Sequence, residues 1–143
     1  DATSQSAAAR KSLGTLRDFR DTVLSETALG RQLIDEYNIF TPRVLYLFIV
    51  EPSLRKEAGR FIEVTTPIVE TMLPRRSARA SGPKVTATVI RAVTLFVETL
   101  IAADCKHKHD SNLSAVVKAR FAEIKPDKLI GLTGSDLKQA LKL

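Results

Sequence analysis

The 143-residue chain has few of the cysteines that cross-link small secreted proteins and lacks the long apolar runs that anchor membrane proteins. It contains one cysteine, which excludes an internal disulfide framework. It has no tryptophan, and its aromatic residues make up only 6% of the sequence. The most apolar run, residues 44–50, is far shorter than the ~20 residues that a membrane-spanning helix requires. The apolar share of 44% and the charged share of 27% are nevertheless typical of a globular protein, so the sequence predicts one folded domain.

Signatures of the common enzyme classes are also missing. The nucleotide-binding loops GxxxxGK[ST] and GxGxxG, the zinc-protease motif HExxH and the hydrolase motif GxSxG do not occur. The neighbouring carboxylates of Asp35 and Glu36 point to different faces of a helix, so they do not predict an acid–base pair. We therefore assign no catalytic residue and no cofactor, and we expect a non-enzymatic protein.

Apolar residues recur at helical spacing along most of the chain. Leu13, Leu16, Phe19 and Val23 are three or four positions apart and therefore share one face of a helix. Such stripes predict an all-α fold, a compact bundle of six or seven helices. Residues 1–10 are expected to form a flexible N-terminal segment before a single helical domain over residues 11–143. The expected core residues are Leu33, Val44, Leu47, Phe61, Val93, Phe96 and Phe121.

Capping residues predict the first helix boundaries. Thr27 is a good N-cap for a second helix. Thr41 followed by Pro42 resembles an N-cap with proline at the first helical position, where the missing N–H costs nothing. Residues 44–50 are apolar all round, so they form either a helix buried in the centre or a strand. Pro42 and Pro52 on either side favour a third helix here.

Prolines and polar loops predict the later boundaries. Pro52 starts a helix, and Pro67 inside it is expected to kink it or to end it near Thr66. Residues 85–103 lack glycine and proline and predict a helix, although alternating apolar residues leave a strand open over 85–90. The remaining signals are a cap at Ser111 or Asn112, a stop at Pro126 and a helix start at Ser135.

Positive charge is concentrated in the second half of the chain. The net charge is +6, but residues 1–73 hold nine basic and ten acidic side chains, whereas residues 74–143 hold thirteen and six. Residues 74–84 contain no acidic residue and are expected to form a basic linker. We predict that this half binds an acidic protein or an anionic surface. The candidate binding residues are Arg75, Arg76, Arg79, Lys84, Lys118 and Arg120.

Two other partner classes stay open. Nucleic acid would also attract a basic surface, but the aromatic residues lie in apolar stripes and are not interleaved with the cations for base stacking. An all-α shell around the apolar residues 44–50 could instead enclose a cavity for an apolar ligand or lipid. The sequence leaves the oligomeric state open.

The candidate metal ligands Cys105, His107 and His109 are clustered in one short segment. Thiolate and imidazole groups are suitable ligands for zinc or copper. However, no second cluster completes a site, and Lys106 and Lys108 would repel a cation. We expect a solvated loop at the end of a helix here, without a bound metal.

Residues 16–62 carry a recognisable pattern. The matching positions are Leu16, Arg17, Phe19, Arg20, Asp21, Leu24, Leu29, Gly30, Arg31, Tyr37, Pro42, Pro52, Leu54 and Arg55. This stretch resembles the helical region of the bacterial and archaeal CFI-box proteins, with the pattern LRxFRDxxL, then GRxxVxxYYxxSP, then PxLR. The Cys-Phe-Ile box itself is absent, and Thr41 stands where that family usually has Ser. The resemblance implies an exported or surface-associated helical module and transfers no catalytic residue.

Overall fold

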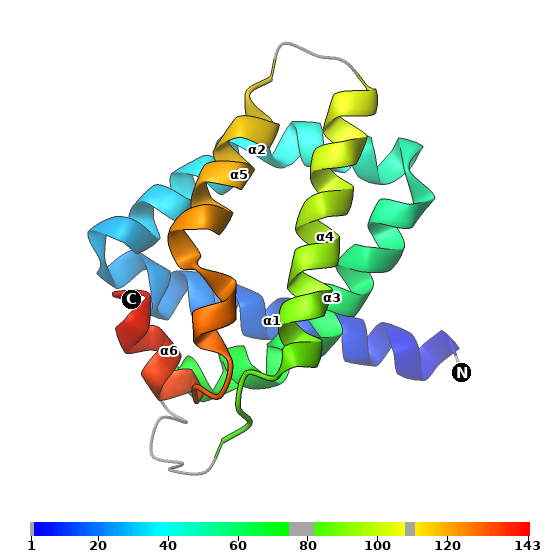
Figure 1. Cartoon of the computed structure of the whole chain (residues 1–143). Coiled ribbons are helices and arrows are strands. Elements are labelled where there is room, and N and C mark those ends of the chain that lie inside the picture. Colours follow the sequence, from blue (N-terminus) through cyan, green and yellow to red (C-terminus); the bar gives the residue numbers. More distant parts are fainter. Residues whose placement is uncertain (1, 75–81, 108–110) are drawn as a thin grey trace.

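The computed structural model describes residues 2–74, 82–107 and 111–143. These residues form six α-helices and no strand, which confirms the predicted all-α bundle (Figure 1). The helices are α1 (Ala2–Thr22), α2 (Ala28–Val50), α3 (Pro52–Met72), α4 (Ala87–Lys106), α5 (Leu113–Ile124) and α6 (Gly134–Ala140), with short 3-10 helices η1 (Leu24–Glu26) and η3 (Pro126–Leu129). Because α1 begins at Ala2, most of the segment predicted to be flexible is helical.

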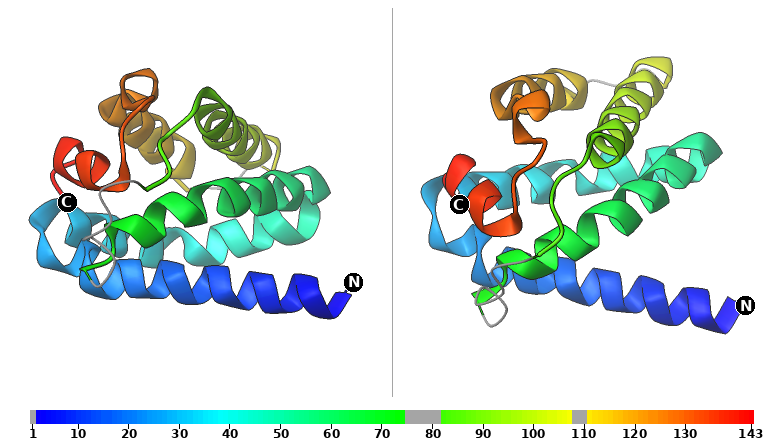
Figure 2. Two further views of the ribbon diagram at one scale, coloured as in Figure 1. Left: turned by 90° about the horizontal axis from the view of Figure 1, so that it is seen from below. Right: turned by 60° about the horizontal axis from the view of Figure 1, so that its bottom comes forward.

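The helices are arranged in layers around α3. Figure 2 shows α1 on one side of the α2–α3 pair and the helices α4 and α5 on the other. One core cluster lies between α2, α3, α4 and α5, and its buried members are Leu47, Leu54, Leu100, Ala103 and Leu113. A second, smaller cluster joins Ile68 of α3 to Val85 and Ile90. Of the seven core residues expected from the sequence, only Leu47 is fully buried, and the other six are half-buried.

The corner between α1 and α2 forms as predicted. The Thr27 hydroxyl caps α2 by accepting a hydrogen bond from the Gly30 amide at 2.9 Å. The chain turns so tightly here that a Cβ at position 30 would lie 1.9 Å from the Leu24 carbonyl oxygen. Glycine is therefore required at this position for steric reasons.

The predicted helix start at Thr41 and Pro42 is wrong. Helix α2 continues through Pro42 to Val50, and the Thr41 hydroxyl donates a hydrogen bond to the Tyr37 carbonyl within the same helix. Proline removes one backbone donor from a helix of 23 residues, and the packing of the inner face against the core compensates for this loss. The expected central burial of residues 44–50 is also wrong, because only Leu47 among them is fully buried.

Helix α3 starts at Pro52, as predicted, but it does not end near Thr66. It continues past Pro67 to Met72. The hydroxyls of Thr65 and Thr66 donate to the carbonyls four residues before them, at 2.7 and 2.6 Å. The kink expected at Pro67 stays a prediction.

The region around Val85 is extended but forms no strand. The Val85 amide donates to the Leu132 carbonyl at 2.8 Å, and its own carbonyl accepts from the Gly131 amide at 2.7 Å. Helix α4 then begins at Ala87 with Thr86 as its N-cap, which supports the helical alternative for this region. These bonds tie the start of α4 to the segment before α6.

The last helices follow the predicted boundaries closely. Helix α5 ends at Ile124, just before Pro126, after which the chain turns through a left-handed Lys125. Helix α6 begins at Gly134, one residue earlier than expected. The reason is a capping box in which Thr133 and Asp136 satisfy each other's backbone amides.

Candidate functional site

The sequence-predicted basic residues lie in different environments. Lys84 and Lys118 are exposed, whereas Arg75, Arg76 and Arg79 lie outside the described residues. Arg120 is half-buried and already ion-paired: its Nε lies 3.0 Å from both carboxylate oxygens of Glu36, and its terminal nitrogen lies 3.0 Å from Glu123. Arg120 thus links α5 to α2. The hydrogen bond from Arg120 lowers the pKa of Glu36, and the same contact raises the pKa of Arg120.

Several other cations of the second half have no counter-ion among the residues that the structure describes. In the part of the chain that the structure describes, no carboxylate forms an ion pair with Lys84, Lys118, Lys125, Lys128, Lys138 or Lys142. In the first half, Arg20, Arg43 and Arg60 each contact a carboxylate, whereas Lys11, Arg17 and Lys56 form no ion pair among the described residues. The charge of an unpaired lysine is not neutralised by a neighbouring carboxylate. Such a lysine therefore attracts an anionic partner more strongly than a paired one does.

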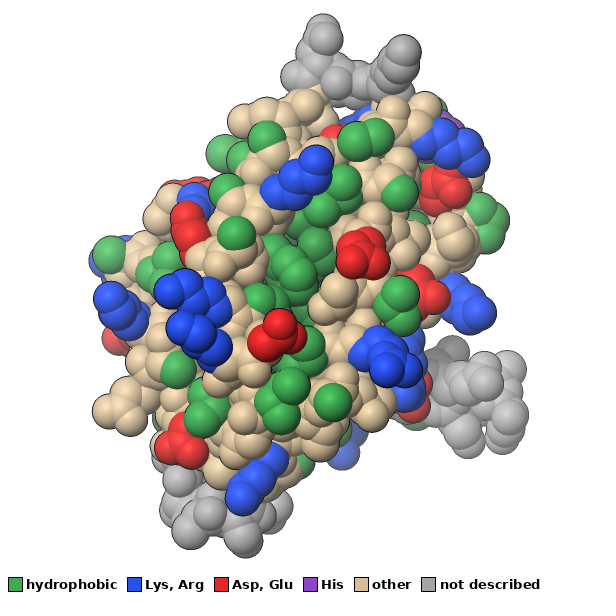
Figure 3. All heavy atoms as spheres, in the orientation of Figure 1, with side chains coloured by type: hydrophobic (Ala, Val, Ile, Leu, Met, Phe, Trp, Pro, Cys, Tyr) green, Lys and Arg blue, Asp and Glu red, His purple; other side chains and the backbone are tan. Residues whose placement is uncertain are grey.

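An apolar hollow lies between α4 and α5. Helix α5 has only one fully buried residue, Leu113, whereas Val117 and Phe121 are half-buried. Figure 3 shows hydrophobic side chains on the floor of this hollow, with Lys and Arg side chains on both sides of it and a few acidic ones between them. The face therefore combines apolar surface with surrounding side chains of both charges.

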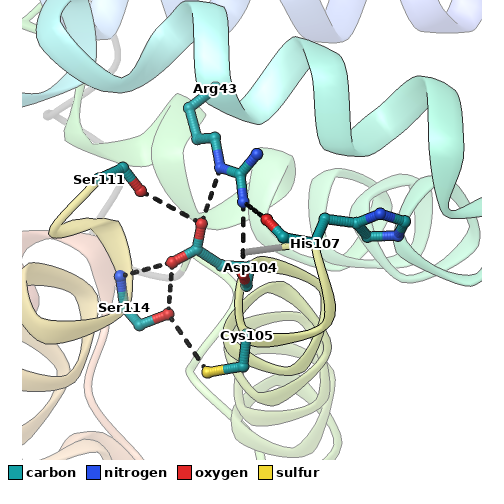
Figure 4. A network of polar contacts seen from close by, with 6 residues as sticks. All are labelled: Arg43, Asp104, Cys105, His107, Ser111 and Ser114. Atoms are coloured by element: carbon teal, nitrogen blue, oxygen red, sulfur yellow. Dashed lines mark hydrogen bonds and ion pairs between the residues drawn. The ribbon is translucent and has the colours of Figure 1, made fainter. Parts of the chain in front are cut away.

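A buried polar network fixes the position of α5 (Figure 4). Asp104, whose side chain is 8% exposed, receives a hydrogen bond from Arg43 Nε at 2.8 Å. Its second oxygen accepts from the backbone amide and the hydroxyl of Ser114 at 3.2 and 2.6 Å. Burial alone would raise the pKa of Asp104, but the hydrogen bonds from Ser114 and Arg43 outweigh it, so the pKa is lowered.

Asp104 therefore caps α5 from a different helix. Asn112 occupies the N-cap position of α5, as the sequence suggested, but its side chain makes no capping bond. The anionic Asp104 instead satisfies an amide in the first turn, where negative charge is favourable. Sequence analysis missed this role because Asp104 and Ser114 belong to different helices.

Two of the candidate metal ligands, Cys105 and His107, are engaged in other contacts. His107 Nε2 lies 2.7 Å from Glu51, and the sulfur of Cys105 lies 3.8 Å from the Ser114 hydroxyl. The hydrogen bond with His107, reinforced by Lys106, lowers the pKa of Glu51. Among the described residues no group of three His, Cys, Asp or Glu side chains is placed to hold a metal, and His109 lies outside those residues.

No helix of the described residues is long and apolar enough to cross a membrane.

The outer face of α2 exposes large apolar side chains. The exposed fractions are 63% for Tyr37, 70% for Ile39, 55% for Leu45, 47% for Tyr46 and 76% for Ile49. A depression of about 610 Å³ lies beside this face, lined by Ile39, Pro42, Tyr46 and the segment around His107. A second depression of about 530 Å³ lies between α1 and α3. The apolar character of residues 44–50 on all sides was the sequence signal for this face.

Comparison of the chain with protein families, curated proteins and solved structures finds no match. The resemblance of residues 16–62 to the CFI-box proteins therefore stays a prediction.

Proposed function

We propose that this protein is a non-enzymatic interaction module that binds an acidic, amphipathic segment of a partner protein in the hollow between α4 and α5. Two observations support the proposal: the apolar floor of the hollow, and the exposed lysines of the second half that form no ion pair among the described residues. An amphipathic helix would place its apolar side in the hollow and its carboxylates against the basic side chains around it. This is the partner class that the charge asymmetry of the sequence predicts.

Charge and apolar contact would contribute differently to this binding. Exposed cations accelerate encounter and orient an acidic partner, and their effect weakens as salt screens it. The apolar floor provides the burial that lowers the dissociation rate. A purely electrostatic partner would leave that floor uncovered, so we favour a segment with both kinds of side chain.

The buried polar cluster supports a binding role rather than a catalytic one. Arg43, Asp104 and Ser114 bond mainly to each other and to backbone groups, and together they hold the end of α4 against α2 and α5. Their polar groups are committed to structural contacts. The network therefore fixes the positions of α4 and α5, the two walls of the hollow, relative to each other.

The test uses a fluorescein-labelled helical peptide that has leucines on one face and glutamates on the other. We expect its anisotropy to rise with added protein and the affinity to fall between about 50 and about 300 mM salt. The variant Lys84→Glu, Lys118→Glu, Lys128→Glu should weaken binding at least about tenfold. The matched control is Lys11→Glu, Arg17→Glu, Lys56→Glu, which changes the net charge equally at exposed positions of α1 and α3. Equal losses in the two variants, or no binding, would contradict the proposal.

An apolar ligand is the second candidate, because the same hollow exposes hydrophobic side chains. The neutral dye Nile red is the probe for this alternative. Salt-independent dye binding without peptide binding would identify a carrier. Labelled single-stranded DNA is the probe for nucleic acid. Binding of the DNA without binding of the peptide would indicate that the lysines bind nucleic acid.

A further inference from the structure

An apolar stripe runs along the solvent side of α2. It consists of Ile39, Pro42, Leu45, Tyr46 and Ile49, all of which are exposed. With 3.6 residues per turn, these positions fall within an arc of about 120° on the helix. The opposite side of α2 carries Val44 and Leu47, which pack into the core. The second half of α2 thus has two apolar faces, of which the described chain covers only one.

The stripe is electrically neutral. Between positions 37 and 50 the only charged side chain is Arg43, which turns inward to the buried carboxylate of Asp104. A neutral apolar surface gives an acidic partner nothing to recognise. It is, however, complementary to itself, which is the property that a two-fold interface requires.

The exposed apolar area suits a second copy of the chain. Its exposed side chains present on the order of 400 Å² of apolar surface, comparable to the largest patch on a typical monomer. A standard interface buries roughly 800 Å² per partner, of which about 60% is apolar. The stripe therefore supplies most of the apolar area for one side of such an interface. The adjoining depression of about 610 Å³ offers a place for a side chain of the second copy.

Charges at the two ends of the stripe favour an antiparallel orientation of two packed α2 helices. Asp35 is exposed one turn before Ile39. At the other end, the exposed Arg55 donates to the carbonyls of Phe48 and Ile49, so its guanidinium lies at the C-terminal end of α2. Antiparallel packing of two α2 helices brings the anionic end of one against the cationic end of the other. Parallel packing would bring like charges together.

We infer that the stripe Ile39–Pro42–Leu45–Tyr46–Ile49 is the interface of a two-fold symmetric dimer in which two α2 helices pack antiparallel. This surface is separate from the hollow between α4 and α5, so either proposal can fail without the other. A dimer would present two copies of the proposed binding face.

The first test is sedimentation velocity of the full chain over a range of concentrations. We expect a dimer whose dissociation constant rises at least about tenfold in Ile49→Glu, because a carboxylate would then be placed in an apolar interface. Ile49 is 76% exposed, so this variant should keep the circular dichroism spectrum of the wild type. Leu95→Glu is the matched control, since Leu95 is an exposed apolar residue of α4, and it should leave the dimer intact.

The second test concerns the antiparallel arrangement. Asp35→Arg and Arg55→Glu should each weaken the dimer, and the double variant should restore part of the lost affinity. A chain that stays monomeric at every concentration, or a dimer that Ile49→Glu leaves unchanged, would overturn the inference. A double variant that is weaker than either single one would overturn the antiparallel arrangement.

Discussion

Arg43 and Asp104 are 61 positions apart in the sequence, and their side chains meet between α2 and α4 with the guanidinium Nε 2.8 Å from the carboxylate. Both side chains are about nine-tenths buried. The same carboxylate holds the first turn of α5 through Ser114. One ion pair therefore sets the relative positions of three helices, including both walls of the proposed binding face.

Removal of the negative charge at position 104 should destabilise the protein strongly. Asp104→Asn preserves the side-chain shape but leaves Arg43 without its counter-ion and weakens the cap on α5. We expect the free energy of unfolding to fall by about 3 kcal/mol, as is typical when a buried pair loses one partner. Urea denaturation followed by circular dichroism measures this change. Glu63→Gln, which removes the exposed partner of Arg60, is the control and should cost less than about 1 kcal/mol.

The stability of the protein should decrease in acid as Asp104 and Glu36 become protonated. The pKa values of Asp104 and Glu36 are lowered from their ordinary 3.8 and 4.5, so the unfolded chain binds protons more readily than the native protein. Their contributions are fully present above these ordinary values and are lost as the pH falls through the lower, native values. We expect the unfolding free energy to fall below pH 4.5. The pH dependence should be shallower in Asp104→Asn, and an unchanged slope would contradict the assignment to this residue.

Two glycine substitutions should have opposite effects. Gly30→Ala would place a methyl group 1.9 Å from the Leu24 carbonyl oxygen and should destabilise the corner between α1 and α2 by several kcal/mol or prevent its formation. Gly59→Ala lies in the middle of α3 with nothing within 4 Å of the new Cβ, and it should stabilise the protein by up to about 1 kcal/mol. Thermal melting curves measure both effects. Equal effects at the two positions would be inconsistent with the geometry of the corner.

The contact between Arg120 and Glu36 should restrain α5. Arg120→Gln removes the bidentate contact with α2, and the amides of α5 should then exchange with deuterium several-fold faster, while those of α3 remain unchanged. Glu123→Gln removes only the contact within α5 and is the matched control. Similar exchange in the two variants would show that Glu36 contributes little to the position of α5.

Local signals in the sequence predicted the helix boundaries that depend on local chemistry. Thr27, Pro52 and Pro126 act through their own backbone or their nearest turn, so their roles were predictable. The helix start at Pro42 and the helix end near Pro67 were predicted wrongly because each proline removes only one backbone donor, and packing on the inner face keeps both helices continuous. The kink at Pro67 stays a prediction.

The candidate sites were less predictable because they depend on distant contacts. The periodicity of residues 44–50 could not indicate which face of α2 the rest of the chain would cover. Asp104 gave no sign that it would cap α5, since its partners come from two other helices. Arg120 was assigned to partner binding from its charge alone, although Glu36, which it pairs with, lies 84 positions earlier.

The most direct test of the proposed function compares two charge-reversed variants in the same titration. The labelled Leu/Glu amphipathic peptide is added to the Lys84, Lys118, Lys128 variant and to the Lys11, Arg17, Lys56 variant at low salt. We expect the first variant to lose at least about tenfold in affinity and the second to bind like the wild type. Equal affinity in the two variants would contradict a binding face on the second half of the chain.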